Sequence, residues 1–321
     1  MRFDLCYGDS NSSVVFCAKY PAHKTLTRLA KRFVTRLIIN ADDFGLTSGV
    51  NQSILDLYNA GALSSATLMT AADHTSAAAA GTTRHLDLSV GCHVVLVDGK
   101  PVLPSRDLSE LTLPSGIFRP TLGAFVVDLT RGGIPELEIE IEAIAQIRRL
   151  QALGIRVTHL DTHKHTHIYP GVLRPLIRAA LARGVRAIRN PFEPDWALKA
   201  THQAPMLRRV QVRLLRTLRR TFLRLVEQAG LTTTDGSIGL LATGTLDTST
   251  IRSLLSAMPA GTWELICHPG YFDTELGRVR TRLKASRMVE HAALQEVVPH
   301  FLRDHPEVSL INYRQLLEQN S

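Results

Sequence analysis

The stretch Thr-His-Leu-Asp-Thr-His-Lys-His-Thr-His-Ile-Tyr at residues 158–169 decides how the rest of the chain is interpreted. Groups that bind metals or move protons occupy every second position: His159, Asp161, His163, His165 and His167. Side chains two residues apart share a face of an extended strand, so we expect several of these groups on one side of a strand and its exit loop. Burying them without partners would cost about 1–3 kcal/mol per group, and a metal ion with a polar substrate would satisfy them. A surface histidine-rich loop is the alternative, and it fits poorly with the apolar helix pattern before the run and Tyr169-Pro170 after it.

Short apolar runs alternate with helical segments on both sides of this stretch. The seven or eight runs that we interpret as strands are 37–41, 63–70, 88–95, 156–161, 185–189, 237–242, 263–268 and 308–312. Helices are expected between them, for example over 134–153 and 172–183. This alternation predicts an α/β fold with a parallel sheet, most simply a closed or distorted (β/α) barrel.

Reactive side chains follow four of the expected strands. They are Asp42 and Asp43, His93, Asp161 with His163, and His268. Taken alone, each has an ordinary explanation, such as an aspartate cap, a satisfied core histidine or a turn residue. Active sites of (β/α) barrels lie at the C-terminal ends of the strands, so four such ends converging on one mouth indicate a functional site.

These residue types suit metal-assisted hydrolysis. One carboxylate and two imidazoles make a site for a divalent ion, with Zn²⁺ the best match on ligand type and Mg²⁺ as the other candidate. Water on a catalytic zinc ion has a pKa of ~7. A second carboxylate can take the proton of that water, and a histidine opposite can protonate the leaving group. A metal-bound water, a base and an acid together are suited to hydrolysing an amide or an ester.

Four motifs carry a resemblance to a known family. They are Leu-Ile-Ile-Asn-Ala-Asp-Asp-Phe-Gly at 37–45, Gly-Cys-His at 91–93, the histidine run at 158–167 and Cys-His-Pro-Gly-Tyr at 267–271. In order and spacing they resemble the motifs of the YdjC-like carbohydrate deacetylases, over roughly residues 36–318. The resemblance implies a distorted (β/α) barrel similar to that of polysaccharide deacetylases and one divalent metal ion. It places the metal on Asp43, His93 and His163, and it implies Asp42 as base and His268 as acid. The sequence leaves open whether the two aspartates exchange roles.

The resemblance also implies roles for three further residues near the metal and the sugar. Asp161 would orient a ligand histidine, and His165 and His167 would shape the sugar site. The run His-Val-Val-Leu-Val-Asp-Gly-Lys-Pro-Val-Leu-Pro at 93–104 resembles, more narrowly, the hopanoid-biosynthesis branch of the family. That resemblance implies removal of an acetyl group from an N-acetylglucosaminyl hopanoid lipid, with soluble chitooligosaccharides as the alternative substrate.

The net charge of +8 is concentrated in two segments. Residues 1–36 carry a net charge of +5, and residues 206–226 carry +7 from seven arginines without an acid, so the remaining chain is negative by four charges. We expect residues 1–35 to form a basic arm in front of one domain over 36–321. The arm fits a disordered segment, a targeting segment or a start-codon artefact.

Residues 206–226 predict a basic amphipathic helix. At about 100° per residue, one side gathers Leu207, Val210, Leu214, Leu215, Leu218, Phe222 and Leu225, and all seven arginines fall on the other half. We expect this helix to dock on an anionic membrane. The alternative is an ordinary barrel helix that packs its apolar stripe on the core and solvates its arginines.

The composition fits a globular protein, since 45% of the 321 residues are hydrophobic and 21% are charged. No window contains the ~18 apolar residues of a spanning helix, and no secretory signal pattern is present. The cysteines Cys6, Cys17, Cys92 and Cys267 are too scattered for a disulfide framework. We therefore expect a cytoplasmic protein, peripheral at the inner face of the membrane.

Two other functions deserve comparison with deacetylation. A metal hydrolase of phosphoesters or cyclic amides would usually present His-x-His at the first strand end, where this chain has Asp42-Asp43. A non-catalytic barrel could bind a membrane or nucleic acid through Arg208 to Arg224, but the candidate residues at all four strand ends are intact. We favour the enzyme and expect no nucleic-acid partner.

Overall fold

The computed structural model describes residues 35–202 and 204–319 of the chain. The expected basic arm, apart from Thr35, lies outside the described residues.

Seven parallel strands form one sheet in the described part of the chain. They are β1 (Thr35–Phe44), β2 (Ser65–Leu68), β3 (Ser89–Val94), β4 (Leu160–Thr162), β5 (Gly236–Ile238), β6 (Gly261–Cys267) and β7 (Val308–Leu310). Their order is β4-β3-β2-β1-β6-β5, and β7 pairs with the beginning of β1. The central strand β1 is buried along almost its whole length, as expected for a parallel strand covered on both faces, and its middle residues Leu37–Ile39 form the apolar run of the sequence.

Isolated bridges close this sheet into a distorted barrel. Ile188 pairs with Leu160 of β4, and Ala187 pairs with Thr232 shortly before β5. Segment 185–189, expected as a strand, therefore lies between the two edges but makes bridges in place of a regular ladder. The predicted α/β barrel is confirmed, with this one irregular side.

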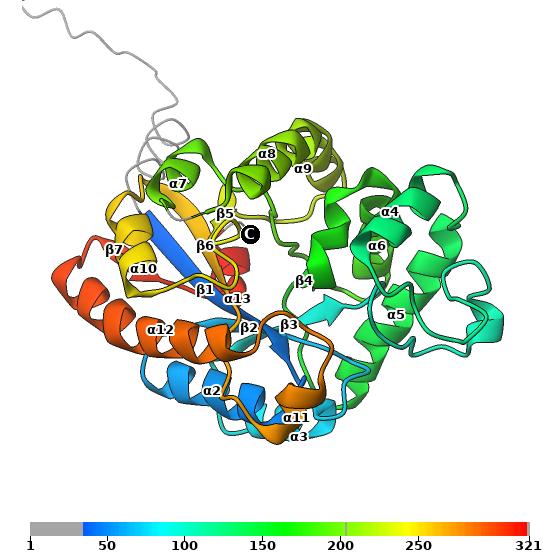
Figure 1. Cartoon of the computed structure of the whole chain (residues 1–321), viewed down its shortest axis with the longest axis horizontal. Helices are drawn as coiled ribbons and strands as arrows, with labels where there is room; N and C mark the ends of the chain where they lie inside the picture. Colours follow the sequence, from blue (N-terminus) through cyan, green and yellow to red (C-terminus); the bar gives the residue numbers. More distant parts are fainter. Residues whose placement is uncertain (1–34, 203, 320–321) are drawn as a thin grey trace, which may run out of the picture.

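Helices surround the barrel (Figure 1). The described helices are α2 (Ser48–Asn59), α3 (Thr75–Thr82), α4 (Leu122–Thr130), α5 (Glu136–Ala152), α6 (Pro170–Ala182), α7 (Asp195–Ala200), α8 (Met206–Leu215), α9 (Arg219–Gln228), α10 (Thr248–Ser256), α11 (Thr274–Arg278), α12 (Ala285–Asp304) and α13 (Tyr313–Glu318). The 3₁₀ turns are η1 (Ser105–Asp107), η2 (His163–Ile168) and η3 (Arg216–Leu218). In Figure 1, α10 and α12 lie on one side of β1, and α5 and α6 lie on the opposite side. None of the helices in the described ranges is long and apolar enough to cross a bilayer.

Helix ends follow the sequence signals with small shifts. Thr47 caps α2 and accepts a hydrogen bond from the backbone N–H of Val50. Acids in the first turn of α5 and Arg149 in its last turn complement the helix dipole. Helix α4 has no counterpart among the expected elements.

The basic stretch 206–226 is helical, but the expected separation of its two faces is wrong. Phe222 and Val226 of α9 are buried, and Leu215 and Leu218 pack against the core. In α8 the buried residue is Val212, which the helical wheel places among the arginines. The apolar side chains of η3 and α9 therefore pack against the barrel as in an ordinary barrel helix. The apolar side chains Leu207, Val210 and Leu214 of α8 do not.

Several arginines of this stretch also point inward. Arg208 donates to the carbonyl oxygens of Thr243 at 2.8 Å and Leu240 at 3.0 Å. Arg209 donates to the carbonyl oxygen of Leu198 at 2.8 Å, and Arg216 pairs with the carboxylate of Asp195. These three side chains tie the helix to the barrel and are not available to a membrane surface.

Candidate active site

The end of β1 presents two neighbouring carboxylates to one side. In a regular strand Asp42 and Asp43 would point to opposite faces. Asp43 has a left-handed backbone with φ of 63°, which aspartate tolerates better than most residues, and the register of β1 against β2 shifts between Ala41 and Phe44. This irregularity lets both carboxylates reach the barrel mouth, where both are buried.

Three side chains from different strand ends meet beside Asp43. Its Oδ1 lies 3.5 Å from Nε2 of His93 and 3.4 Å from Nδ1 of His163. The two histidine nitrogens are 3.3 Å apart. A tetrahedron with zinc bonds of about 2.0–2.1 Å has edges of roughly 3.3 Å. The three atoms thus have the spacing of one face of a tetrahedral metal site, and the fourth vertex is left for another ligand.

Asp43 Oδ1 strengthens this interpretation because it is buried without a hydrogen-bond partner among the described residues. Buried polar atoms almost always have a partner. The other oxygen, Oδ2, accepts a hydrogen bond from Arg287 of α12 at 2.5 Å. Burial would raise the pKa of Asp43, but Arg287, His163 and His93 together lower it well below its usual value. Asp43 is therefore ionised, with one oxygen turned toward the two histidines.

Asp161 of β4 orients His93. Its Oδ1 lies 2.8 Å from Nδ1 of His93. A histidine that donates from Nδ1 keeps the lone pair of Nε2 for a metal, and metal-binding histidines commonly have such a carboxylate partner. Burial would lower the pKa of His93, but Asp161, with Asp42 and Asp43, raises it to about 9. The hydroxyl of Thr67 lies between Asp42 and Asp161, at 3.3 and 3.2 Å from their oxygens.

Arg189 lies at the centre of the charge network, although the sequence analysis did not single it out. Its fully buried guanidinium donates to both oxygens of Asp42, at 2.7 and 2.8 Å, and to Glu264 at 2.8 Å, and it also pairs with Asp161. Burial would raise the pKa of Asp42, but Arg189, assisted by His93 and His268, holds it below its usual range. The position of Arg189 at the end of an expected strand is the signal that could have identified it.

Helix α12 supplies two residues, Arg287 and Glu290, that strand ends could not predict. The carboxylate of Glu290 accepts the backbone N–H of His268 at 2.6 Å. Together with the contact of Arg287 to Asp43, this bond joins α12 to both sides of the site. Arg287 and Glu290 lie inside a long helix with an unremarkable sequence, so no local pattern marks them.

The charges in the site favour a divalent cation. Four buried acids, Asp42, Asp43, Asp161 and Glu264, face two buried arginines, Arg189 and Arg287. When all are ionised and His93 is protonated, as its raised pKa of about 9 implies, one negative charge remains without a counterion. A metal ion that displaces the proton of His93 would meet two, and uncompensated buried charge is costly. Ligand types, spacing, the unpartnered oxygen and charge balance all fit a divalent metal ion on Asp43, His93 and His163.

His268 faces Asp42 from the end of β6. Its Nε2 lies 3.8 Å from Oδ2 of Asp42, and its Nδ1 is buried without a partner among the described residues. Burial lowers the pKa of His268 to about 4, against the attraction of Asp42 and Asp43. The imidazole is therefore neutral at neutral pH and can accept a proton.

The histidine run does not form the alternating strand face that its spacing predicts. β4 ends at Thr162, and His163–Ile168 is a 3₁₀ turn in which Lys164 and His165 have left-handed φ values of 56° and 53°. Lys164 Nζ donates to Asp98 Oδ2 at 2.6 Å and anchors this turn to the segment after β3. The turn, and not a strand, directs His163 toward Asp43.

The other histidines of the run lie in the interior. His159 stacks on Tyr313 with ring centroids 3.7 Å apart, and its Nε2 lies 3.2 Å from Asn40 Oδ1. His167 Nδ1 lies 2.7 Å from the hydroxyl of Thr162. His165 Nδ1 and His167 Nε2 are buried without partners among the described residues, so both can receive a polar ligand. His159 is a core residue.

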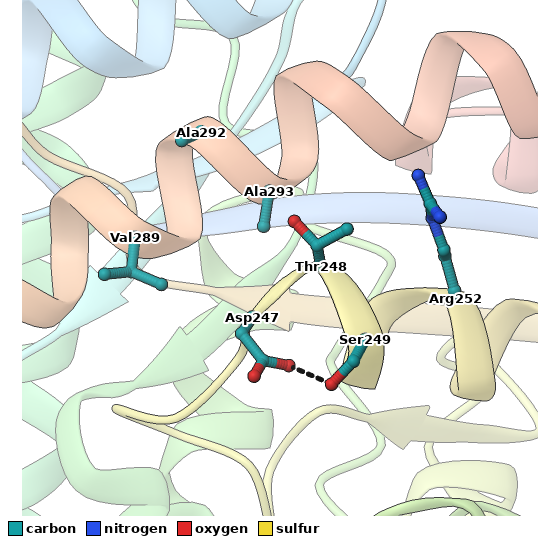
Figure 2. Close-up of a pocket in the computed structure, with 7 residues that line it drawn as sticks. All are labelled: Asp247, Thr248, Ser249, Arg252, Val289, Ala292 and Ala293. Atoms are coloured by element: carbon teal, nitrogen blue, oxygen red, sulfur yellow. Dashed lines mark hydrogen bonds between the residues drawn. The ribbon is translucent and has the colours of Figure 1, made fainter.

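A surface cavity of about 670 Å³ lies elsewhere, between α10 and α12 (Figure 2). Asp247, Arg252 and Val289 are among its lining residues, and none of the candidate site residues lines it. Asp247 is already used as the cap of α10, where it accepts from the backbone N–H of Thr250 at 2.8 Å. This cavity therefore lies apart from the converging side chains, from which we assign the site.

A barrel mouth with this ligand set, a second carboxylate and an opposing histidine is typical of metal-dependent hydrolases. The family of YdjC-like proteins matches residues 36–301, and the chain belongs to this family.

Several relatives of this chain are known as carbohydrate deacetylases. The protein of Thermoanaerobacter pseudethanolicus is 28% identical over 278 residues, covering 86% of this chain and 97% of that protein. The Mus musculus protein is 32% identical over 246 residues, covering 74% and 78%. A solved structure from Enterococcus faecalis V583, of a protein whose suggested role is cellobiose-phosphate cleavage, has a TM-score of 0.72 at 24% identity and covers 88% of this chain and 99% of that one. This last likeness supports the fold.

Proposed function

We propose that the chain is a metal-dependent hydrolase that removes the N-acetyl group from an acetylated amino sugar. The observation that carries the proposal is the triangle formed by Asp43 Oδ1, His93 Nε2 and His163 Nδ1 beside a second ionised carboxylate. The carbohydrate deacetylases among its relatives supply the substrate class. A bound divalent ion, Zn²⁺ or Mg²⁺, would polarise the amide carbonyl and acidify a water molecule.

The residues opposite the triangle move the protons. Asp42, kept ionised by Arg189, takes a proton from the water whose oxygen attacks the acetyl carbon. His268 Nε2 lies 3.8 Å from Asp42, and the neutral imidazole can receive this proton and deliver it to the departing nitrogen. The C–N bond breaks, and the products are acetate and a free amino group. Asp161 orients His93, and the unpartnered nitrogens of His165 and His167 contact the sugar.

Acetate release from an N-acetylated amino sugar tests this assignment. Losing the base or the acid typically costs 10²–10⁴-fold in rate, so we expect Asp42→Asn and His268→Ala to keep the fold and the metal but lose most activity. Tyr169→Phe, outside the proposed machinery, serves as a control. Near-normal activity in either variant would show that its role is wrong, and activity unaffected by chelator would remove the metal from the mechanism.

We further propose that the sugar is lipid-linked, as in an N-acetylglucosaminyl hopanoid. The support is the run 93–104 quoted above, whose first residues after His93, from Val94 to Val97, are buried and so shape the barrel beside the site. Acetate release from N-acetylglucosaminyl hopanoid is to be compared with release from chitobiose. We expect the lipid-linked sugar to have the higher kcat/KM, and a preference for chitobiose would favour the soluble alternative.

A further inference from the structure

One face of α8 is apolar and uncovered. Met206, Leu207, Val210 and Leu214 are 77%, 71%, 54% and 69% exposed, and we call these four residues the α8 face. Single exposed apolar residues are common, but four on successive turns of one helix make a continuous patch, which usually marks an interaction surface. The rest of the stripe is buried or partly buried against the core, so packing within this chain does not account for these four.

Exposed cations accompany the α8 face in the sequence, one in α8 itself and two in α9. Arg213, Arg220 and Arg224 are exposed, and none of them forms an ion pair within the described ranges. No acid interrupts residues 206–226. An ordinary surface helix mixes charges of both signs for pairing along the helix, and this one does not. The three arginines therefore remain available to an anionic partner.

A second basic segment lies on the same rim. Residues 278–284 contain Arg278, Arg280, Arg282 and Lys284 without an acid. Arg208 of α8 bonds to the carbonyl oxygen of Thr243, and a Cβ placed on the next residue, Gly244, would lie 3.0 Å from Leu283. The loop after β5 thus connects α8 with the segment that follows β6, so α8 and residues 278–284 adjoin the end of the barrel that carries His268.

We propose that the α8 face and these two basic segments dock the protein on an anionic lipid bilayer, with the active-site mouth toward the membrane. Apolar side chains flanked by arginines match the acyl boundary and the phosphate layer of such a surface. A second copy of the chain would fit poorly, because a two-fold contact through this face would bring arginines against arginines. Nucleic acid would leave the apolar side chains without a partner. The proposal stands without the deacetylase assignment, although it suits a lipid-linked sugar.

Vesicle sedimentation of the full chain tests the proposal with two triple variants. We expect binding to phosphatidylcholine vesicles that contain phosphatidylglycerol, little binding to phosphatidylcholine alone, and weaker binding as salt increases. Leu207→Ser, Val210→Ser and Leu214→Ser together should weaken binding at least about tenfold. Each arginine near an anionic surface strengthens binding about fivefold, so Arg213→Glu, Arg220→Glu and Arg224→Glu together should weaken it by roughly a hundredfold or more.

Matched controls alter the opposite end of the barrel. Leu86 and Leu153 are exposed at 76% and 38%, shortly before the strand β3 and the segment leading to β4. Leu86→Ser with Leu153→Ser, and Arg148→Glu with Arg149→Glu and Arg156→Glu, should bind anionic vesicles as the wild type does.

Four outcomes would overturn the docking surface: no binding to anionic vesicles, equal binding to neutral ones, wild-type binding by either triple variant of residues 206–226, or a wild-type dimer that these triple variants convert to monomers. Acetate release from a soluble acetylated sugar should be unchanged in both triple variants of residues 206–226. If the chain binds anionic vesicles but releases no acetate from any acetylated sugar, the proposed function is wrong and the docking surface is still supported.

Discussion

At the scale of single residues, the site depends on the backbone of Asp43. Its left-handed φ of 63° turns a carboxylate that a regular strand would point away from the mouth toward His93 and His163. Asparagine also tolerates this conformation but lacks the charge. Asp43→Asn therefore separates the role of the charge from that of the backbone.

Metal content is the first prediction at this scale. Elemental analysis should show about one divalent ion per chain, falling sharply in Asp43→Asn, His93→Ala and His163→Ala, because each removes one donor of the triangle. His165→Ala is the matched control from the same run and should keep the metal. Unchanged metal in both His93→Ala and His163→Ala would contradict the assignment.

Arg189 gives a second prediction. Replacing its planar guanidinium with the single ammonium of lysine keeps the buried charge but loses the two-point contact with Asp42. With less stabilisation of its ionised form, Asp42 should titrate at higher pH. The acidic limb of the pH–kcat profile should therefore move to higher pH in Arg189→Lys. If the acidic limb lies at the same pH in the wild type and in Arg189→Lys, Arg189 has only a structural role.

At the scale of elements, strand ends were predictable and their local geometry was not. Periodicity located the strands, and parallel strands align their C-terminal ends, so Asp42, Asp43, His93, His163 and His268 come together as expected. The spacing of the histidine run indicated a strand, but left-handed Lys164 and His165 end it after Thr162. Such angles depend on contacts like that of Lys164 with Asp98, which lies far away in the sequence.

The loop after β5 gives a prediction for pH. Glu193 accepts the backbone N–H groups of Gly239 at 2.9 Å and Leu241 at 2.7 Å. Burial raises its pKa from 4.5 to about 7, although these bonds and Arg208 act to lower it. Because the folded-state value is the higher one, this contribution to stability is fully present below the unfolded-state pKa and is lost as pH rises through about 7.

Urea unfolding at about pH 5 and about pH 8 measures this effect. The wild type should lose unfolding free energy on going to the higher pH. Glu193→Gln cannot titrate, so its loss should be smaller, by on the order of 1–3 kcal/mol. Part of the decline should remain, because burial also raises the pKa of Glu290 to about 7. Glu227→Gln, at an exposed position, is the control, and equal declines in all three proteins would exclude Glu193 as the titrating group.

At the scale of the whole molecule, the buried charges should couple the metal to stability. With His93 neutral, the site carries two excess negative charges when its acids are ionised, and an ion that binds only the folded chain stabilises it. At a metal concentration 1,000-fold above Kd the gain is about 4 kcal/mol. Calorimetry should show a lower Tm after chelation, restored by the divalent ion. Asp43→Asn should have nearly the same Tm with and without chelator, and a large remaining difference would place the stabilising ion elsewhere.

The strand that bears Asp42 and Asp43 is also the most extensively paired one. β1 pairs with β6 from Thr35 to Ala41, with β7 over its first three residues and with β2 from Asn40 onward. Strands in this position are usually the last part of a fold to open, and their amides exchange with solvent only when the whole chain unfolds. We therefore expect the two carboxylates to lie on the slowest-exchanging part of the protein, while the proposed sugar contacts His165 and His167 come from a 3₁₀ turn. Residual activity during heating would accordingly report the survival of the entire domain and not the melting of one segment.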